Sequence, residues 1–386
     1  MTDYITIGVI YMKKISIAVI GLNFGYHFAR IYAKHPDVEN VYIVDSDDKR
    51  LNNYIKEQGT PNTIICKSFD EVLKNPEVDA IHICTGIPSH AEMTTATLNA
   101  GKHCACAVPM GISIEEIKDI VETTRKTGKN YMMMETQLYS SPYIKACEML
   151  KNGEFGKVQH MRGVHFQPME YWAGYWMGLP PMHYATHIIA PLHGIAGSRI
   201  KNVRCIGSGT MDEKYTKVYG NPYPIEEAII EFENGLKGQI VRGLFECAAL
   251  PTEDFNIYGS ERTLMSEYEG MIIEKIYDEN SFDKYRWNKI NIKWKNYYEL
   301  LPEELHEFTL ELEPEQQKNW KDYLDTGRMS MHGGSHPHLV HEFVRSIIEN
   351  RKPSINEDIS ANITAAGICA HISALNNGQI TEIPEF

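Results

Sequence analysis

The sequence lacks long apolar runs, paired cysteine motifs and an excess of basic residues. No apolar run reaches the ~20 residues that span a bilayer, so we expect no membrane partner. Lys and Arg number 38 against 51 Asp and Glu, and the net charge of −13 argues against nucleic acid and anionic membranes as partners. The eight cysteines include no C-x-x-C pair. This favours reduced, buried thiols in a cytoplasmic protein over disulfides or a zinc site.

The amino-terminal residues lack the basic region and cleavage site of a signal peptide. We interpret residues 1–12 as an N-terminal extension, with a misplaced start codon as the alternative, because Met12 directly precedes KKISIAVIG. The chain has 386 residues, of which 43% are hydrophobic and 23% charged. This composition is typical of globular proteins, and the length is sufficient for two domains.

The stretch from Ile15 to Asp45 has the order strand, glycine turn, helix, strand. ISIAVIG at 15–21 is a continuous, mostly β-branched apolar run, typical of a strand buried on both faces. GLNFG follows at once, and NVYIVD ends on a carboxylate. Such a unit places backbone N–H groups where they stabilise a pyrophosphate, and the acid can bind the adenosine ribose. The predicted dinucleotide site includes Gly21, Asn23, Phe24, Gly25 and Asp45.

The glycine pattern departs from the usual G-x-G-x-x-G fingerprint. Asn23 stands at the second glycine position and Tyr26 at the third, with a glycine at Gly25 instead. Asn tolerates positive φ and can make the turn, while Gly25 can allow close approach of the phosphate. Ser46 rather than an arginine follows Asp45, so a 2′-phosphate would meet uncompensated negative charge and NAD is favoured over NADP. The alternative interpretation is an ordinary βαβ unit without a ligand.

Short strands and helices alternate up to about residue 135, which predicts a parallel, doubly wound sheet. The expected strands after Asp45 are 63–66, 78–85, 102–107 and 130–135. Ligands bind beyond the carboxyl ends of such strands, so side chains there belong to one cleft. The further cofactor-binding candidates are Thr85, Gly86, Pro88, His90, Ala107 and Pro109.

Longer strands with few helices between them follow, which indicates a second domain. The expected strands are 158–166, 203–207, 226–233, 239–245, 254–258 and 271–277. They predict an open antiparallel sheet. We expect residues 280–330 to form irregular or helical surface, and residues 338–349 and 362–376 to form helices.

These segments together resemble the Gfo/Idh/MocA oxidoreductases, a family of sugar and polyol dehydrogenases. The resemblance is carried by GLNFG, Asp45, VDAIHICTGIPSHAEMTTATLNAGKHCACAVPM, LKNGEFGKVQHMRG and HEFVRSIIENRKPSI. It implies an α/β protein with an N-terminal Rossmann doubly wound parallel sheet at 13–136. A C-terminal α/β domain with a large open, mainly antiparallel sheet is implied at 137–386. The resemblance also implies NAD, a small carbohydrate or polyol substrate, and a homo-oligomer (dimer or tetramer) that associates through the open sheet.

Two departures from the family pattern concern the catalytic groups. Ala107-Val108-Pro109 stands where the family has E-K-P, and Val108 cannot replace the lysine that binds the reacting hydroxyl. His183 and His187 stand at the places of the family's D-x-x-x-H. On a helix these histidines would share one face, and imidazole can accept or return a hydroxyl proton near neutral pH. Tyr139, at the domain junction, is a third catalytic candidate, with a packing role as the alternative.

Aromatic and histidine clusters provide the candidates for substrate binding. Glu170, Trp172 and Trp176 can form a sugar platform, or they can be core or interface residues. His336 precedes a helix and could point into the cleft, and His332 is a weaker candidate. A metal ion held by His183, His187 and His336 is conceivable. However, H-Y-A-T-H lacks the glutamate of H-E-x-x-H, and we expect no metal.

We therefore predict an NAD-dependent oxidoreductase that transfers a hydride between nicotinamide and a hydroxyl carbon of a sugar, sugar acid or polyol. Histidine would act as the acid/base. THIIAPLHG also resembles the T-H-G-L-G-P segment of NAD-dependent glycosidases, which implies an alternative that uses transient C3 oxidation, elimination and addition of water. A non-catalytic NAD-sensing regulator is a third interpretation, which Val108 favours.

Overall fold

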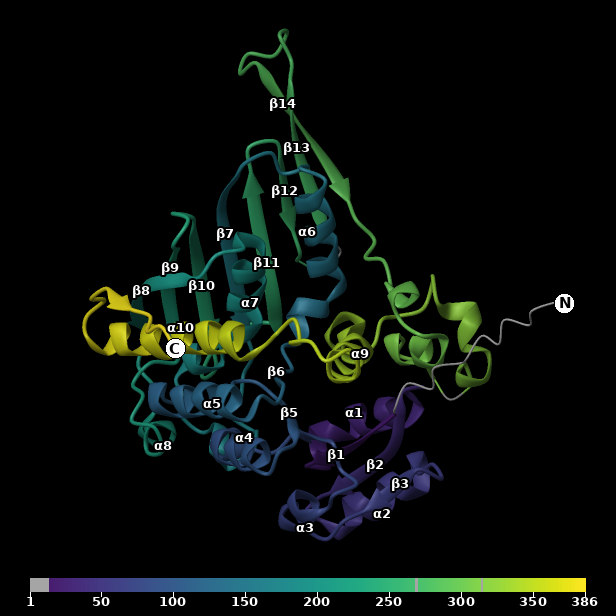
Figure 1. Cartoon of the computed structure of the whole chain (residues 1–386). Helices are drawn as coiled ribbons and strands as arrows, with labels where there is room; N and C mark the ends of the chain where they lie inside the picture. Colours follow the sequence, from purple (N-terminus) through teal and green to yellow (C-terminus); the bar gives the residue numbers. More distant parts are fainter. Residues whose placement is uncertain (1–13, 268–269, 314) are drawn as a thin grey trace, which may run out of the picture.

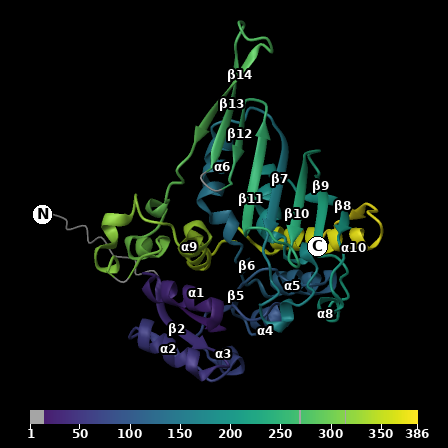
Figure 2. The same cartoon turned by 180° about the vertical axis from the view of Figure 1, so that it is seen from behind.

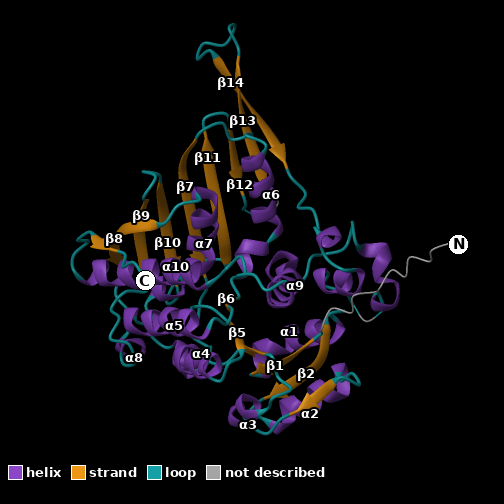
Figure 3. Cartoon of the chain, in the orientation of Figure 1, coloured by secondary structure: helices purple, strands orange, loops and turns teal. Residues whose placement is uncertain are grey.

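The computed structural model describes residues 14–267, 270–313 and 315–386, so the extension predicted at 1–12 lies outside the described residues. The described chain forms one sheet of six strands and one of nine. Helices α9 and α10 lie between the two sheets (Figures 1 and 3). None of the helices in the described ranges is long and apolar enough to cross a membrane.

The first sheet has six parallel strands in the order β3-β2-β1-β4-β5-β6. All residues of β1 are buried, as its continuous apolar run predicts for a parallel strand. The strand order reverses between β1 and β4, which is where doubly wound sheets bind ligands. The strands are β1 Ile15–Ile20, β2 Val38–Val44, β3 Thr63–Ile65, β4 Ala80–Ile83, β5 His103–Cys106 and β6 Tyr131–Met133.

The helices between these strands begin and end at local sequence signals. The side chains of Asp47, Ser68 and Ser113 cap α2, α3 and α5 by accepting backbone N–H bonds. Gly128 ends α5 in the left-handed conformation. The helices are α1 Leu22–Lys34, α2 Asp48–Gln58, α3 Phe69–Lys74, α4 His90–Asn99 and α5 Ile114–Thr127.

The second sheet is mixed but mostly antiparallel, in the order β14-β13-β12-β11-β7-β10-β9-β8-β15. The pair β7 and β10 is parallel, and the other pairs are antiparallel. The predicted fold class is confirmed. The strands are β7 Val158–Phe166, β8 Ile200–Ser208, β9 Ile225–Phe232, β10 Lys237–Gly243, β11 Thr252–Gly259, β12 Arg262–Met265, β13 Met271–Tyr277, β14 Tyr285–Asn291 and β15 Thr381–Glu382.

Helices pack on one face of this second sheet. Helix α7 contacts β7 and β11, and α10 contacts β8 and β9. The opposite face is seen in Figure 2 without a helix of the described chain over it. Ile206 and Ile229 are exposed on β8 and β9, so the homo-oligomer expected through this face stays a prediction. The helices of this half are α6 Ser141–Lys151, α7 Thr186–Ala196, α8 Glu213–Thr216, α9 Ser335–Ile348 and α10 Glu357–Leu375.

The prediction for residues 280–330 is wrong over the length of β14. This strand pairs with β13 in a hairpin that projects from the molecule (Figure 1). Every residue of β14 is exposed, so neither face of the strand has to be apolar. Its sequence therefore lacks the regular alternation of apolar and polar residues that would indicate a strand. Short 3-10 helices form much of the remainder of that segment: η5 Tyr298–Leu300, η6 Glu303–Thr309 and η7 Gln317–Tyr323.

The carboxyl-terminal half returns to pack against the nucleotide-binding half. Helix α9 contacts α1. His341 Nδ1 lies 3.0 Å from His35 Nε2, and Arg345 forms a 2.8 Å ion pair with Asp37. The domain boundary expected after residue 136 stays a prediction. Residues far apart in the sequence therefore meet at the loop between α1 and β2.

Candidate active site

The glycine turn joins β1 to α1 with little space for side chains. Gly21 has a φ of 88°, and a Cβ there would lie 2.8 Å from the Cys84 carbonyl oxygen. A Cβ on Gly25 would lie 2.8 Å from Cγ1 of Val19 and 3.1 Å from Cβ of Cys84. Gly25 thus allows α1 to pack on the sheet, which differs from the expected role of approaching a phosphate. Asn23 is exposed on the first turn of α1 without a positive φ, so the expectation that it makes the turn is wrong, and Gly21 makes it instead.

Asp45 follows β2 and is engaged by protein groups. Its carboxylate accepts hydrogen bonds from the backbone N–H of Leu22 at 2.6 Å and of Asp47 at 2.8 Å. Arg50, in the first turn of α2, places Nη1 3.1 Å from the same carboxylate. The premise that negative charge here is uncompensated is therefore wrong, because a cation four residues beyond Ser46 reaches the carboxylate.

His90 connects the loops that follow β4 and β5. Its two ring nitrogens lie 2.8 Å from the Pro109 carbonyl oxygen and 3.1 Å from that of Thr85. Burial alone would lower its pKa, but the Cys106 sulfur and these carbonyls raise the pKa of His90 to about 9. The imidazole therefore fixes the two loops relative to each other. The other candidates of this cleft, Gly86, Pro88 and Ala107, lie in the same loops.

His183 and His187 do not share one face of one helix, so that prediction is wrong. His183 belongs to the short 3-10 helix η4, Pro181–Tyr184, and α7 begins only at Thr186. Ala185, with φ −103° and ψ 8°, separates the two turns. The His183 ring packs edge-on against His371 at 5.3 Å between centroids, whereas His187 is directed to a different group of side chains.

The surroundings of His183 keep it neutral. Burial and the neighbouring His371 lower the pKa of His183 to about 3. His371 in turn lies 2.7 Å from the Glu226 carboxylate through Nδ1. Because His183 contacts His371 while His187 contacts Glu135, the metal site considered from His183, His187 and His336 does not form.

His187 is the centre of a buried charged cluster. Its Nδ1 lies 2.6 Å from Oε1 of Glu135 and 3.4 Å from Oε1 of Glu253. Glu135 follows β6, and Glu253 comes from β11. Burial would lower the pKa of His187, but Glu135 first and Glu253 second raise it to about 9. The imidazole is thus held in place by carboxylates that stabilise its protonated form.

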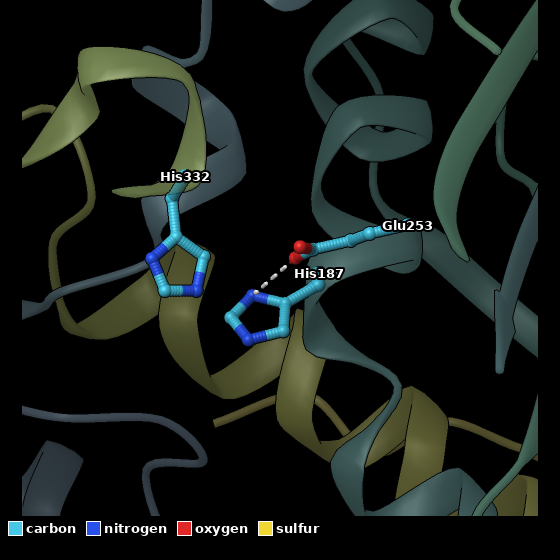
Figure 4. Close-up of side chains that lie close together, drawn as sticks. All are labelled: His187, Glu253 and His332. Carbon is cyan, nitrogen blue, oxygen red and sulfur yellow. Dashed lines mark ion pairs between the residues drawn. The ribbon is translucent and has the colours of Figure 1, made fainter. Parts of the chain in front are cut away.

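His332 completes this cluster from a different part of the chain. It lies in η8, Met331–Gly334, with a positive φ of 53°. Its ring is 5.9 Å from that of His187, and its Nδ1 is 3.2 Å from Nε2 of His336. Burial lowers the pKa of His332, although Glu253 opposes this effect. Figure 4 shows His187, Glu253 and His332 gathered at one place.

His336 joins the cluster to the glycine turn. Its ring lies 5.6 Å from Phe24 and 4.6 Å from Phe28 on α1, and it is buried. The structure therefore brings together three predicted residues, Phe24, His187 and His336. Sequence reasoning missed Glu135 and Glu253. Glu135 closes a parallel strand as Asp45 does, so the same argument could have found it.

The predicted aromatic platform leads toward His187. Trp172 is half-exposed and contacts Trp176, which packs on Tyr184 at 4.7 Å between centroids. The Tyr184 ring lies 5.3 Å from that of His187. Glu170 accepts the backbone N–H of Glu246 at 2.6 Å. The aromatic rings thus contact one another in series from Trp172 to the imidazole, but Trp176 is buried in a hydrophobic cluster and only Trp172 is exposed.

Tyr139 lies in a different environment from the His187 cluster. Its hydroxyl is 2.7 Å from Oγ of Ser354, and its ring stacks on His338. With Tyr143 and Glu342 it lines a cavity of about 210 Å³. Burial raises the pKa of Tyr139 well above its usual range. A proton-transfer role for Tyr139 in the cluster stays a prediction.

About the first third of the chain matches a known family. Residues 15–135 match the family described as "Oxidoreductase family, NAD-binding Rossmann fold", GFO_IDH_MocA. Residues 15–135 are thus similar to the NAD-binding domain of the Gfo/Idh/MocA oxidoreductases. The resemblance expected from the sequence is therefore confirmed, and NAD is the cofactor that this family implies.

The chain is also similar to curated proteins and to solved structures. The chain is 25% identical over 249 residues to glycosyl hydrolase family 109 proteins of Bacteroides thetaiotaomicron and Porphyromonas gingivalis, covering 58% of this chain and 52% of each relative. It thus spans about half the length of these curated relatives. Levoglucosan dehydrogenase with NADH and levoglucosan has a TM-score of 0.73 at 17% identity, covering 97% and 100% of the chains. Scyllo-inositol dehydrogenase from Lactobacillus casei with NAD(H) and scyllo-inositol gives 0.68 at 18%, covering 96% and 99%. These structures share the fold.

The glycine turn between β1 and α1 fits a dinucleotide. The absent Cβ of Gly21 keeps the turn close to β4, and Gly21 has no side chain to cap α1. Backbone N–H groups at the start of α1 would hold a pyrophosphate, and Asp45 lies at the end of the neighbouring strand.

Proposed function

We infer that the protein is an NAD-dependent oxidoreductase acting on a hydroxyl carbon of a sugar, sugar acid or polyol. The single observation that carries this proposal is the 2.6 Å contact between His187 and Glu135 in a chain with an NAD-binding domain. A carboxylate held against one imidazole nitrogen orients the ring for proton transfer at the other. The bound cofactor supplies hydride transfer at nicotinamide.

In this proposal His187 takes the proton of the substrate hydroxyl during oxidation and returns it during reduction. Glu135 fixes the ring and stabilises the imidazolium form. Val108, buried at the end of β5, offers no charge there, so the proton must be handled from the other half of the chain. Trp172, which is half-exposed, provides an apolar face against which a sugar ring can pack.

The test is NADH formation by chelator-treated protein offered NAD and a panel of sugars, sugar acids and polyols. Loss of a general acid/base costs about 10²- to 10⁴-fold in rate, so His187→Asn should lower kcat by that factor. His160→Asn is the matched control, because His160 stacks on Tyr258 in the second sheet. Wild-type protein that oxidises none of these substrates, or a His187→Asn variant with unchanged kcat, would contradict the proposal.

The glycosyl hydrolase relatives support a second candidate, an NAD-dependent glycosidase. Here the sugar is oxidised at C3, a base removes the C2 proton, the leaving group is eliminated, water adds, and the keto group is reduced. The bases expected from the sequence are His183 and Tyr139, which contact His371 and Ser354 instead of His187. This arrangement favours the simple oxidoreductase. Cleavage of aryl glycosides without net NADH, with solvent deuterium entering C2, would support the glycosidase instead.

A further inference from the structure

Three side chains from distant segments place atoms that can bind a metal ion close to one another. One nitrogen of His187, one nitrogen of His332 and a carboxylate oxygen of Glu253 all lie within 4.8 Å of one another. They come from α7, η8 and β11, and Figure 4 shows them facing one space. We propose that His187, Glu253 and His332 form a binding site for a divalent cation of the zinc class.

Unsatisfied polarity in the cluster supports a missing ligand. Oε1 of Glu253 is buried, and within the described ranges it has no hydrogen-bond partner. Its 3.4 Å approach to Nδ1 of His187 is an ion pair, longer than a hydrogen bond. A buried carboxylate oxygen left without a donor is costly, about 1–3 kcal/mol or more, and a cation would satisfy it.

The neighbours of the two imidazoles orient them as ligands. Metal-binding histidines usually have their second nitrogen held by a carboxylate or another polar group. In His187, Nδ1 is held by Glu135 at 2.6 Å and also lies 3.4 Å from Glu253. In His332, Nδ1 is held by Nε2 of His336 at 3.2 Å. Each ring is therefore fixed by a polar neighbour before any ion arrives.

The local charge and access also suit a cation. Glu135 and Glu253 place two carboxylates around His187, while Glu253 itself retains 24% side-chain exposure. The ion would thus enter a negative environment from the Glu253 side. Two imidazoles and one carboxylate are the ligands of three-coordinate catalytic zinc sites, which keep a fourth position open. Mg²⁺ and Ca²⁺ prefer oxygen ligands and should bind poorly.

The cation site goes beyond the proposed function and does not depend on it. A cation bound by the His187 imidazole would compete with the proton that this ring must accept. The proton-accepting state of the enzyme is therefore the cation-free state, which is why the oxidation assay uses chelator-treated protein. Cation binding is tested without NAD or substrate, so one proposal can fail while the other can still be tested.

The experiment titrates the chelator-treated, full-length chain with Co²⁺ and then with Zn²⁺. Co²⁺ reports its ligands through visible absorption bands, and calorimetry gives the Zn²⁺ affinity. Glu253→Gln keeps the side-chain shape and removes the charge. His332→Asn is chosen because Asn tolerates the positive φ at this position. His160→Asn is again the control, and circular dichroism checks the fold of each variant.

We expect one equivalent of Co²⁺ to give intense bands, Zn²⁺ to displace it, and Mg²⁺ to have no effect. Losing even an outer partner of a metal ligand costs about 10- to 100-fold in affinity, so Glu253→Gln and His332→Asn should each weaken Zn²⁺ binding by at least that factor. His160→Asn should bind like wild type. Absence of a Co²⁺ spectrum would overturn the proposal, as would unchanged Zn²⁺ affinity in either folded cluster variant.

Discussion

Replacing Glu135 by glutamine tests how the protein keeps a proton on His187. The change preserves the side-chain shape but removes the charge from the 2.6 Å contact. Burial lowers the pKa of His187, but Glu135, with a smaller effect of Glu253, raises it from 6.5 to about 9. That difference corresponds to about 3 kcal/mol, at about 1.4 kcal/mol per pH unit. Because Glu253 remains in the variant, we expect a loss of about 2 kcal/mol in the free energy of unfolding near pH 6.

The sign of the pH dependence follows from linkage. A group whose pKa is higher in the folded than in the unfolded state stabilises the fold fully below the unfolded value, and loses this effect as pH rises through the folded value. Wild-type stability should therefore fall by up to about 3 kcal/mol between pH 6.5 and about 9. The variant should have a flatter profile over that range. Urea denaturation of chelator-treated protein at a series of pH values measures both curves, with Glu227→Gln on β9 as the control.

The same substitution should move the pH profile of oxidation. Since the neutral imidazole accepts the proton, wild-type kcat/KM should rise about tenfold per pH unit until about pH 9. In Glu135→Gln the rising part should move to lower pH, while the maximum rate falls because the ring is less well oriented. If Glu135→Gln keeps the wild-type pH dependence of both stability and rate, Glu135 does not control the protonation of His187.

Three further substitutions test other parts of the structure. Gly25→Ala should destabilise the fold by about 1–3 kcal/mol through crowding against β1, whereas Gly174→Ala, which meets open space, should leave the melting temperature unchanged. Arg50→Ala removes the cation beside Asp45 and should lower use of NADP by about fivefold, near 1 kcal/mol, with kcat/KM for NAD little changed; equal effects on both cofactors would refute a role in discrimination. Ile229→Asp places a charge on the open face of the second sheet and should lower the mass measured by light scattering, because the chains associate through that face in our prediction. An unchanged mass would contradict association through this face.

The nucleotide-binding half was predictable because its signals are local. The strand ending at Asp45 is a continuous apolar run, and Ser113 and Gly128 mark the two ends of α5 within the sequence itself. The antiparallel strands with one buried face also alternate visibly. In contrast, β14 is exposed along its length, so nothing in its pattern indicates a strand.

The site was predictable only in part, since its members come from distant segments. His187 was predictable from its motif. Its partner Glu253 was not, because acidic residues are common on strands and the sequence does not distinguish this one. His183, four residues from His187, suggests a shared helix face, yet the non-helical backbone at Ala185 directs the two rings to different neighbours. His332 could not be ranked above His336 from the sequence, because only the folded structure shows that the His332 ring lies beside that of His187.

The packing of α9 on α1 has a consequence for how this chain can be divided. His336 covers Phe28, and the ion pair between Arg345 and Asp37 joins residues 308 positions apart. A fragment ending near residue 135 would leave that apolar surface in water. During synthesis, likewise, the nucleotide-binding half stays incomplete on the ribosome until the segment carrying α9 has emerged. Cofactor binding by the nascent chain should therefore come late in synthesis.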